Sequence, residues 1–301
     1  MKPKLKIIVA MTSFGTLPIF VRNIGLSSGE IAFFRAVIAA AVIALLKLIS
    51  KNKIIFSNIK KDLLLLFLSG IAMGFNWIFL FQAYKYTTVS VATLSYYFAP
   101  VIVMAASPFL FKERLTIKQI VCFIMATIGL IMVIGVSGAG EHSSNYIGII
   151  CGIGAAVLYA AVILLNKFIK KITGIDRTLI QLLAAAIVLA PYVLVSTGIS
   201  LGSLNSKGII NLLIIGIVHT GICYCLYFSS IRDLKGQEAA ILSYIDPLVA
   251  VTVSVVILGE TISVLQVTGG ILLLGFTLLN ETDFESARVF RLLKPTKTER
   301  L

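Results

Sequence analysis

The chain has 301 residues, of which 58% are hydrophobic and only 13% are charged. A mean hydropathy of +1.02 excludes an ordinary soluble domain and favours a protein embedded in a lipid bilayer. The net charge of +13 comes from lysine and arginine gathered on one side of the predicted membrane topology, so it requires no nucleic-acid partner.

Apolar stretches long enough to cross the hydrocarbon layer as helices follow one another along the chain. They are expected at residues 7–24, 31–49, 63–83, 88–111, 117–136, 146–168, 178–197, 209–230, 237–258 and 263–280. Apolar runs of this length, without alternation of polar residues, indicate helices and not a β-barrel. The first run has no small-x-small cleavage site, so we interpret it as an uncleaved helix and not a signal peptide. The predicted fold class is an all-α integral membrane protein with ten transmembrane helices.

Lysine and arginine are distributed unevenly between the two ends of these spans. If the N-terminus is cytoplasmic, all but four of the 26 basic residues fall in cytoplasmic segments. The exceptions are Arg22, Arg35, Lys85 and Lys207. The positive-inside rule therefore predicts that both termini are cytoplasmic, and that the loop at 137–145, which has no basic residue, is external.

One segment of the chain occurs twice. Ala92-Thr-Leu-Ser-Tyr-Tyr-Phe-Ala-Pro100 returns as Ala239-Ala-Ile-Leu-Ser-Tyr-Ile-Asp-Pro247, and at the same offset Glu113 corresponds to Glu260. An internal duplication in a membrane protein is typical of two similar halves around a central site. Each copy contains five spans, an odd number, so the second copy is expected to be inverted relative to the first. We expect a first five-helix repeat at 7–136, a second, inverted repeat at 146–280 and a cytoplasmic tail at 281–301.

The duplicated motif, together with Phe33-Phe-Arg35-Ala-Val-Ile-Ala39 in the second span, resembles the EamA-type branch of the drug/metabolite transporter superfamily. The resemblance covers roughly residues 7–280. It implies secondary transport of small polar metabolites by alternating access in the cell (inner) membrane, with no enzymatic activity and no cofactor. Amino acids or related compounds, moved by export, are the first expectation. The expected partners are a small-molecule substrate and the lipid bilayer, and the oligomeric state stays open.

Other functions fit parts of the sequence. Proton-coupled uptake of a cationic metabolite would use the same helices. A channel or a lipid scramblase, from another functional class, would need a continuous polar path, and the inverted repeat with its prolines argues against that path. A membrane enzyme would need acids or histidines clustered at one surface, and the sequence shows no such cluster and no ATP-binding loop.

The duplicated prolines and one acid carry the first mechanistic expectations. Pro100 and Pro247 are expected inside the fourth and ninth spans as candidate hinges, because each removes a backbone N–H; a packing kink is the alternative. Asp246 is expected near the middle of the ninth span, where an acid costs about 2.5–3.5 kcal/mol and should face the interior. Its counterpart in the first copy is Ala99. Asp246 is the candidate coupling residue, for a proton or a substrate ammonium group; a neutral, hydrogen-bonded acid is the alternative.

Polar and aromatic side chains of several spans form a candidate substrate pocket. His219, Cys223 and Tyr227 share one face of the eighth span if it is α-helical throughout. The predicted substrate-binding set is Asn76, Trp77, Tyr97, His219, Tyr224, Tyr227, Tyr244 and Asp246. Each of these residues, taken alone, also fits a packed interior position. Arg35 is expected near the outer end of the second span, where it binds a carboxylate or extends to the lipid headgroups.

The two glutamates that follow the duplicated motif are given structural roles in preference to catalytic or coupling roles. Glu113 and Glu260 precede the sequences Thr116-Ile-Lys-Gln119 and Ser263-Val-Leu-Gln266, which are typical of capping boxes. An acid just before a helix also suits the helix dipole. The four cysteines fall inside the spans and are interpreted as small apolar residues, so no metal site is predicted.

The topology can be tested by labelling loops in intact cells with a membrane-impermeant reagent. A cysteine in the loop at 137–145 should react from outside, whereas one in the basic segment at 51–61 should react only after permeabilisation, because the positive-inside rule keeps that segment cytoplasmic. Reaction of the segment at 51–61 in intact cells would reverse the orientation.

Overall fold

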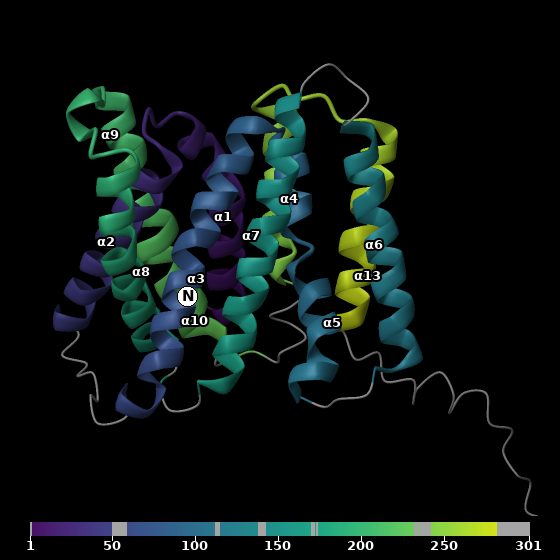
Figure 1. The fold of residues 1–301 in the computed structure, drawn as a ribbon, viewed down its shortest axis with the longest axis horizontal. Coiled ribbons are helices and arrows are strands. Elements are labelled where there is room, and N and C mark those ends of the chain that lie inside the picture. Colours follow the sequence, from purple (N-terminus) through teal and green to yellow (C-terminus); the bar gives the residue numbers. More distant parts are fainter. Residues whose placement is uncertain are drawn as a thin grey trace, which may run out of the picture.

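The computed structural model describes residues 2–49, 59–111, 115–137, 143–169, 172, 174–231, 234 and 242–281, and these residues form helices and short connections (Figure 1). The elements of the first half are α1 (Pro3–Arg22), α2 (Ser28–Ile49), α3 (Ile59–Tyr86), α4 (Val89–Tyr96), α5 (Ala99–Phe111) and α6 (Ile117–Ser137). Those of the second half are α7 (Ser143–Phe168), α8 (Gly174–Ser196), the short 3-10 helix η2 (Leu201–Ser203), α9 (Ser206–Leu213), η3 (Ile214–Ile222), α10 (Cys223–Ile231), α12 (Ile245–Val256) and α13 (Val264–Glu281).

The fold class predicted from hydropathy is confirmed. In the described parts of the chain, eight helical spans are long and apolar enough to cross a membrane, and α12 and α13 are shorter apolar helices. Two of the long spans are composite: Val89–Phe111 joins α4 and α5, and Ser206–Ser230 joins α9, η3 and α10. The surface of the bundle is apolar, since Phe109 and Val195 are 87% and 89% exposed. Such a surface suits lipid and would be unfavourable in water.

Capping boxes begin three of the helices. The amide of Thr116 donates to the side-chain oxygen of Gln119 at 2.8 Å, and the amide of Gln119 donates to Oγ1 of Thr116 at 3.2 Å. Ser263 and Gln266 make the same pair of bonds, at 2.9 and 3.1 Å. Both predicted boxes are therefore confirmed, and Ser27 with Glu30 forms a third at the start of α2. Glu113, the segment at 51–58 and the tail beyond residue 281 lie outside the described residues.

Pro100 lies inside the span Val89–Phe111, as expected, but that span is not one continuous helix. α4 ends at Tyr96 and α5 begins at Ala99, so Pro100 is the second residue of α5. Pro247 is likewise the third residue of α12. A proline is tolerated in the first turn because its missing N–H has no partner there. The helix breaks before each proline, and the proline starts the next segment.

Asp246 lies at the corresponding break of the ninth span. It is the second residue of α12, and Tyr244, two residues earlier, is in a turn. An acid in the first turn is favoured by the helix dipole. The break in the ninth span thus presents a carboxylate at a helix N-terminus, and residues 237–241 of the expected span lie outside the described residues.

The contacts between helices come in matched pairs. α1 packs against α12 and α10, and α7 packs against α4 and α3; α2 packs against η3, and α8 packs against α3. α2 with α8, α4 with α12 and α6 with α13 also pack together. If the five spans of the first half are exchanged with the five of the second, the contacts of α1 and α7 form matched pairs, as do those of α2 with η3 and α8 with α3, and the last three contacts map onto themselves. This is the pattern that two-fold related halves would produce.

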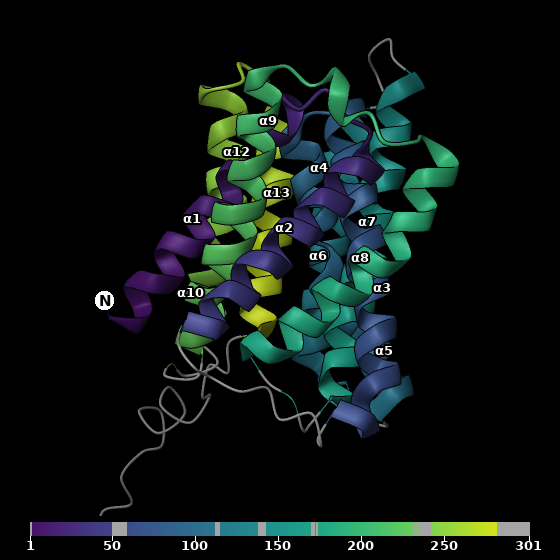
Figure 2. The ribbon, with the colours of Figure 1, turned by 90° about the vertical axis from the view of Figure 1, so that its left-hand side faces the viewer.

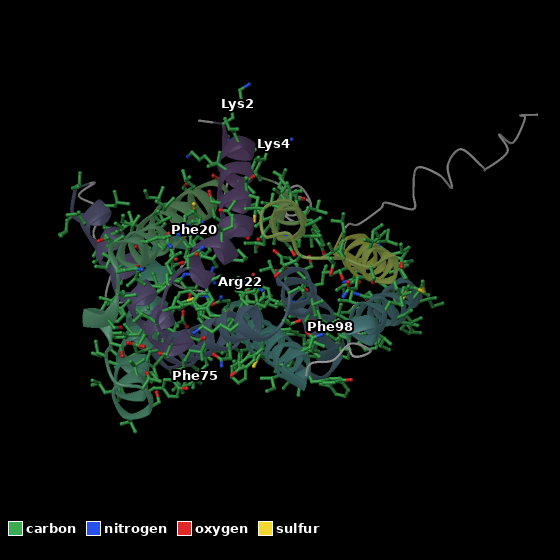
Figure 3. All side chains as sticks on the ribbon, turned by 90° about the horizontal axis from the view of Figure 1, so that it is seen from above. Lys2, Lys4, Phe20, Arg22, Phe75 and Phe98 are labelled. Atoms are coloured by element: carbon green, nitrogen blue, oxygen red, sulfur yellow. The ribbon has the colours of Figure 1, made fainter. Side chains whose placement is uncertain are left out.

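The helices surround a common interior. Figure 1 shows α6 and α13 side by side at one edge of the molecule, and Figure 2 shows α1 running obliquely, with its N-terminus protruding beside α10. Seen from above, α1 runs from Lys2 and Lys4 at the rim to Phe20 and Arg22 near the middle (Figure 3). The main apolar core joins α1, α2, α3, α4, α7, α8, α9, η3 and α12, so the two halves share one core.

The close packing of α6 on α13 gives a stability test. A Cβ on Gly269 would lie 2.6 Å from the carbonyl oxygen of Gly129, and a Cβ on Gly129 would meet the Gly269 oxygen at the same distance. Gly269→Ala should therefore destabilise the protein by about 1–3 kcal/mol, measured by thermal unfolding in detergent. Gly275→Ala on the same helix, where the new Cβ meets nothing within 4 Å, is the control and should cause no loss. Equal stability of the two variants would contradict this packing.

Candidate functional site

Arg35 of α2 lies inside the bundle. The residue is only 3% exposed, and its Nε donates a hydrogen bond to Oγ1 of Thr220 at 2.6 Å. The guanidinium carbon stands 4.3 Å from the ring centroid of Trp77 and 5.5 Å from that of Phe81. Arg35 thus does not extend to the lipid headgroups, which was one of the two expectations for it.

The depth of Arg35 follows from where α2 begins. The helix starts at Ser28, earlier than the expected residue 31, and this places Arg35 about 10 Å along the helix from its first residue. An arginine deep in a membrane costs about 2.5–3.5 kcal/mol, so it needs partners. Stacking on Trp77 offsets part of this cost through a cation–π interaction.

The hydrogen bond to Arg35 depends on the π-helical geometry of η3. The hydroxyl of Thr220 donates to the carbonyl oxygen of Ile215, five residues earlier, at 2.9 Å. Its oxygen is then free to accept the Nε proton of Arg35. π-helical turns are rare and often occur at functional sites. Here one brings a hydroxyl of the second half to a cation of the first half.

Asp246 lies opposite, where the breaks of the fourth and ninth spans meet. Its Oδ2 accepts a hydrogen bond of 2.6 Å from the hydroxyl of Tyr97, which lies between α4 and α5. Asp246 and Tyr97 are both half-buried.

Tyrosines of α3, α4 and α10 lie near the two charged side chains. Arg35 is within electrostatic range of Tyr84, Tyr96, Tyr224 and Asp246. Within the described residues, Arg35 and Asp246 form no direct ion pair. We call this group the polar centre; it comprises Arg35, Trp77, Tyr84, Tyr96, Tyr97, Thr220, Tyr224 and Asp246. Its residues come from α2, α3, α4, η3, α10, α12 and the α4–α5 break, so both halves contribute.

The structure brings together part of the predicted substrate-binding set. Trp77, Tyr97, Tyr224 and Asp246 belong to the polar centre. Tyr244 is adjacent, with its ring centroid 6.5 Å from that of Tyr97.

The other predicted residues are directed elsewhere. Nδ2 of Asn76 donates to the carbonyl oxygen of Ala155 at 2.6 Å, which ties α3 to α7. His219 has one ring nitrogen 3.1 Å from Oγ1 of Thr16 and the other 3.3 Å from the Ile214 carbonyl oxygen. Tyr227 packs in an apolar cluster beside α1. The common face expected for His219 and Tyr227 assumed α-helical spacing, and η3 changes that spacing.

Three residues of the polar centre, Tyr84, Tyr96 and Thr220, are not among those predicted from the sequence, and for Arg35 the sequence left two positions open. A signal for Arg35 was present, because it is the only charge between Glu30 and Lys47 and such residues usually face the interior. Tyr96 adjoins Tyr97 in the duplicated motif. Nothing in the sequence marked Thr220, because its position depends on a π-helical turn.

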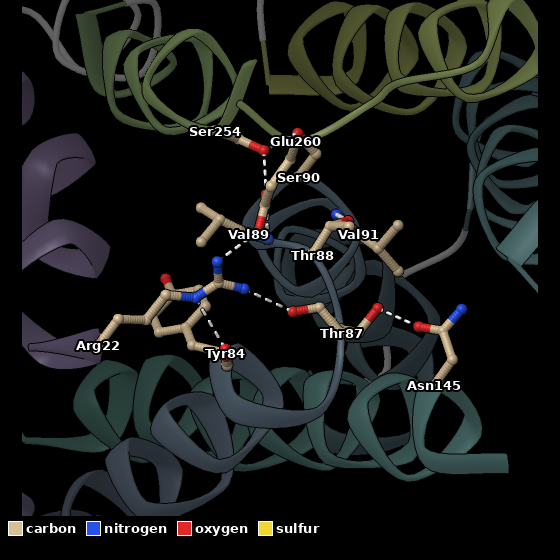
Figure 4. A network of polar contacts seen from close by, with 10 residues as sticks. All are labelled: Arg22, Tyr84, Thr87, Thr88, Val89, Ser90, Val91, Asn145, Ser254 and Glu260. Atoms are coloured by element: carbon tan, nitrogen blue, oxygen red, sulfur yellow. Dashed lines mark hydrogen bonds and ion pairs between the residues drawn. The ribbon is translucent and has the colours of Figure 1, made fainter. Parts of the chain in front are cut away.

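A second polar network joins the two halves at the end of the bundle that the charge distribution predicts to be external (Figure 4). We call it the outer contact; it comprises Arg22, Thr87, Val89, Ser90, Asn145, Ser254 and Glu260. Glu260 forms an ion pair with Arg22 and accepts the amide of Val89, at the start of α4, at 2.8 Å. It also accepts a hydrogen bond from the hydroxyl of Ser254.

Neighbouring groups extend this contact across the halves. Oγ of Ser90 donates to Oγ of Ser254 at 2.8 Å, and Arg22 donates to the Tyr84 and Thr87 carbonyl oxygens at 2.9 and 2.8 Å. The side chain of Thr87 bonds Asn145 of α7. Glu260 was expected to interact with the dipole of the helix that follows it. Its carboxylate instead caps the N-terminus of a different helix, α4.

Apolar helices around a buried polar centre define a multi-pass membrane protein. The sequence model of the EamA-like transporter family matches two segments of the chain, residues 2–135 and 146–281. The protein therefore belongs to the EamA-like transporter family and is a membrane transporter, which confirms the resemblance drawn from the motifs.

Relatives agree with this assignment. "Uncharacterized transporter YxxF" of Bacillus subtilis is 28% identical over 276 residues, covering 89% of this chain and 88% of that protein. A "Probable amino-acid metabolite efflux pump" of Salmonella typhimurium is 27% identical over 243 residues, covering 77% and 81%. A protein known from a crystal structure aligns over 97% of this chain and 99% of its own with a TM-score of 0.65; at 19% identity it shows the shared fold. The named relatives are transporters, not enzymes.

The outer contact can be tested by accessibility. In a variant whose four native cysteines are replaced by alanine, a cysteine at Ser90, which is 4% exposed, should react slowly with a water-soluble maleimide. Adding Glu260→Gln should raise that rate about tenfold or more, because charge-assisted bonds worth about 1.5–3 kcal/mol are lost.

The control is a cysteine at Asn23, which is exposed at the same end of the bundle and should react equally fast with and without Glu260→Gln. An unchanged rate at position 90 in the Glu260→Gln protein would mean that this carboxylate does not hold the halves together.

Proposed function

We propose that this protein is a secondary transporter that exports small polar metabolites, amino acids or related compounds, by alternating access. The observation that carries the proposal is the polar centre, where Asp246 and Arg35 face a group of tyrosines contributed by both halves. Groups of this kind bind a small polar molecule by hydrogen bonds and charge. The apolar residues around them separate the bound molecule from the lipid.

The proposed movement exchanges the conformations of two inverted halves. The matched helix contacts support such halves, and so do the two separate matches of one family model. Pro100 and Pro247 mark the points at which the fourth and ninth spans are broken. Half-helices joined by a short break can tilt separately, and for this reason these prolines are the proposed hinges.

The outer contact indicates which side of the membrane is closed in this conformation. With both termini cytoplasmic, as the basic residues predict, Arg22 and Glu260 close the polar centre on the external side. An exporter takes its substrate from the cytoplasm and must then open this contact to release it. The named efflux activity of the Salmonella relative supports export over uptake.

Asp246 is the observation that favours the second candidate, proton-coupled uptake of a cationic metabolite. Within the described residues the Asp246 carboxylate accepts one hydrogen bond, from a tyrosine hydroxyl, so it can also hold either a proton or an ammonium group. A channel or scramblase is less compatible, because the ion pair and hydrogen bonds of the outer contact interrupt a continuous polar path.

Asp246→Asn tests the proposal in liposomes. Purified wild-type protein should exchange radiolabelled amino acids across the membrane. Asp246→Asn should lower that exchange about 100-fold and leave the protein folded, because the substrate loses the charge that binds its ammonium group. Loss of proton-driven accumulation with normal exchange would instead assign Asp246 to proton coupling.

Asp176→Asn is the matched control, since Asp176 pairs with Lys47 at the start of α8 and does not belong to the polar centre. It should transport normally. Normal exchange and a normal pH profile in Asp246→Asn would refute the role of this carboxylate, and a wild-type protein that moves no amino acid or related metabolite would refute the proposed function itself.

A further inference from the structure

Arg35 is a buried cation that no anion of the described protein contacts. Within the described residues its one hydrogen bond uses Nε, and the terminal nitrogens Nη1 and Nη2 make none. We propose that they bind the carboxylate of the transported molecule, so that the substrate is a zwitterion held between Arg35 and Asp246. This inference rests on the proposed transport function.

The geometry of the guanidinium favours a carboxylate. Trp77 covers one side of the plane at 4.3 Å and Thr220 fixes Nε, so the ring and the hydroxyl together hold the plane in one orientation. The two terminal nitrogens then present parallel N–H donors, which match the two oxygens of a carboxylate. A side chain held in this way loses little further freedom on binding.

The charge of Asp246 indicates which group the substrate carries at its other end. Asp246 is an acid within electrostatic reach of Arg35, and among the described residues only its Oδ2 accepts a hydrogen bond, from Tyr97. A carboxylate on Arg35 would leave Asp246 without a cation, and an ammonium group on Asp246 supplies one. A molecule with both groups leaves no uncompensated charge in the interior.

A phosphate ester fits less well. The terminal nitrogens of Arg35 would also accept phosphate, but a phosphate group carries nearly two charges at pH 7. Lys85 of α3 donates to the carbonyl oxygen of Leu26, and this bond holds it at the outer end. One guanidinium therefore balances one carboxylate.

A purely structural arginine would use its donors on the protein. Arg22 shows the contrast within the same chain, because Nε and Nη2 bond backbone carbonyls and Nη1 pairs with Glu260. Arg35 is more deeply buried, yet it has a single hydrogen bond. The missing partners of Arg35 are what the substrate supplies.

The test compares Arg35→Gln with wild type in proteoliposomes, using matched pairs of an amino acid and its amide, which keeps the ammonium group and lacks the carboxylate. Arg35→Gln should raise KM for the amino acid on the order of 100-fold, from the loss of a buried charge-assisted pair, and change KM for the amide less than about threefold. Arg35→Lys keeps the charge without the planar fork and should fall between. Arg177→Gln on α8 is the control and should behave as wild type.

A second variant guards against misfolding of Arg35→Gln. Thr220→Ala keeps the charge and removes the bond that orients it, so KM for the amino acid should rise about three- to tenfold with the amide unchanged.

The outcomes separate the inference from the function. Arg35→Gln and Thr220→Ala proteins that treat amino acid and amide alike would overturn the carboxylate site. A wild-type protein that moves amides and amines but no amino acid, or one that prefers phosphoethanolamine, would also overturn the carboxylate site. The proposed transport function would remain supported in both cases. A wild-type protein that moves none of these probes would overturn both proposals.

Discussion

Burial of two opposite charges in a bundle of apolar helices is the constraint on which the rest of this structure depends. Arg35 and Asp246 are near enough to interact but form no ion pair. Arg35 instead donates a hydrogen bond to Thr220 of the opposite half and lies over two aromatic rings, and Asp246 accepts a hydrogen bond from Tyr97 of the opposite half. Because a lone charge in a membrane interior is costly, these contacts fix how α2, η3, α4 and α12 meet.

Irregular backbone occurs where these charges are held. α4 breaks before α5, α12 begins after a turn, and η3 is a π-helical insertion between α9 and α10. A non-helical backbone is tolerated in a membrane protein when it is enclosed by protein or faces water. Each irregular segment supplies a polar side chain to the centre: Tyr97, Asp246 and Thr220 respectively. The departures from regular helix therefore place the chemistry of the site.

Glu260 connects this centre to the end of the bundle. Its carboxylate meets Arg22 and the start of α4, and its neighbour Ser254 meets Ser90. α4 leads from this contact to Tyr97, and α12 leads from Asp246 back to Ser254. The same two broken spans thus carry both the groups of the polar centre, which we propose face the substrate, and part of the outer contact.

The sequence by itself determined the number of spans, the all-α class, the family and the capping boxes at Thr116 and Ser263, because hydropathy and local hydrogen bonding act over short stretches of chain. It also selected Trp77, Tyr97, Tyr224 and Asp246. Only the tertiary structure decided that Pro100 and Pro247 begin helices, that η3 is π-helical and that Glu260 caps α4. The interior position of Arg35 was also decided by the tertiary structure. Trp77, Thr220 and Asp246 are distant from Arg35 in sequence and come near it only when both halves pack.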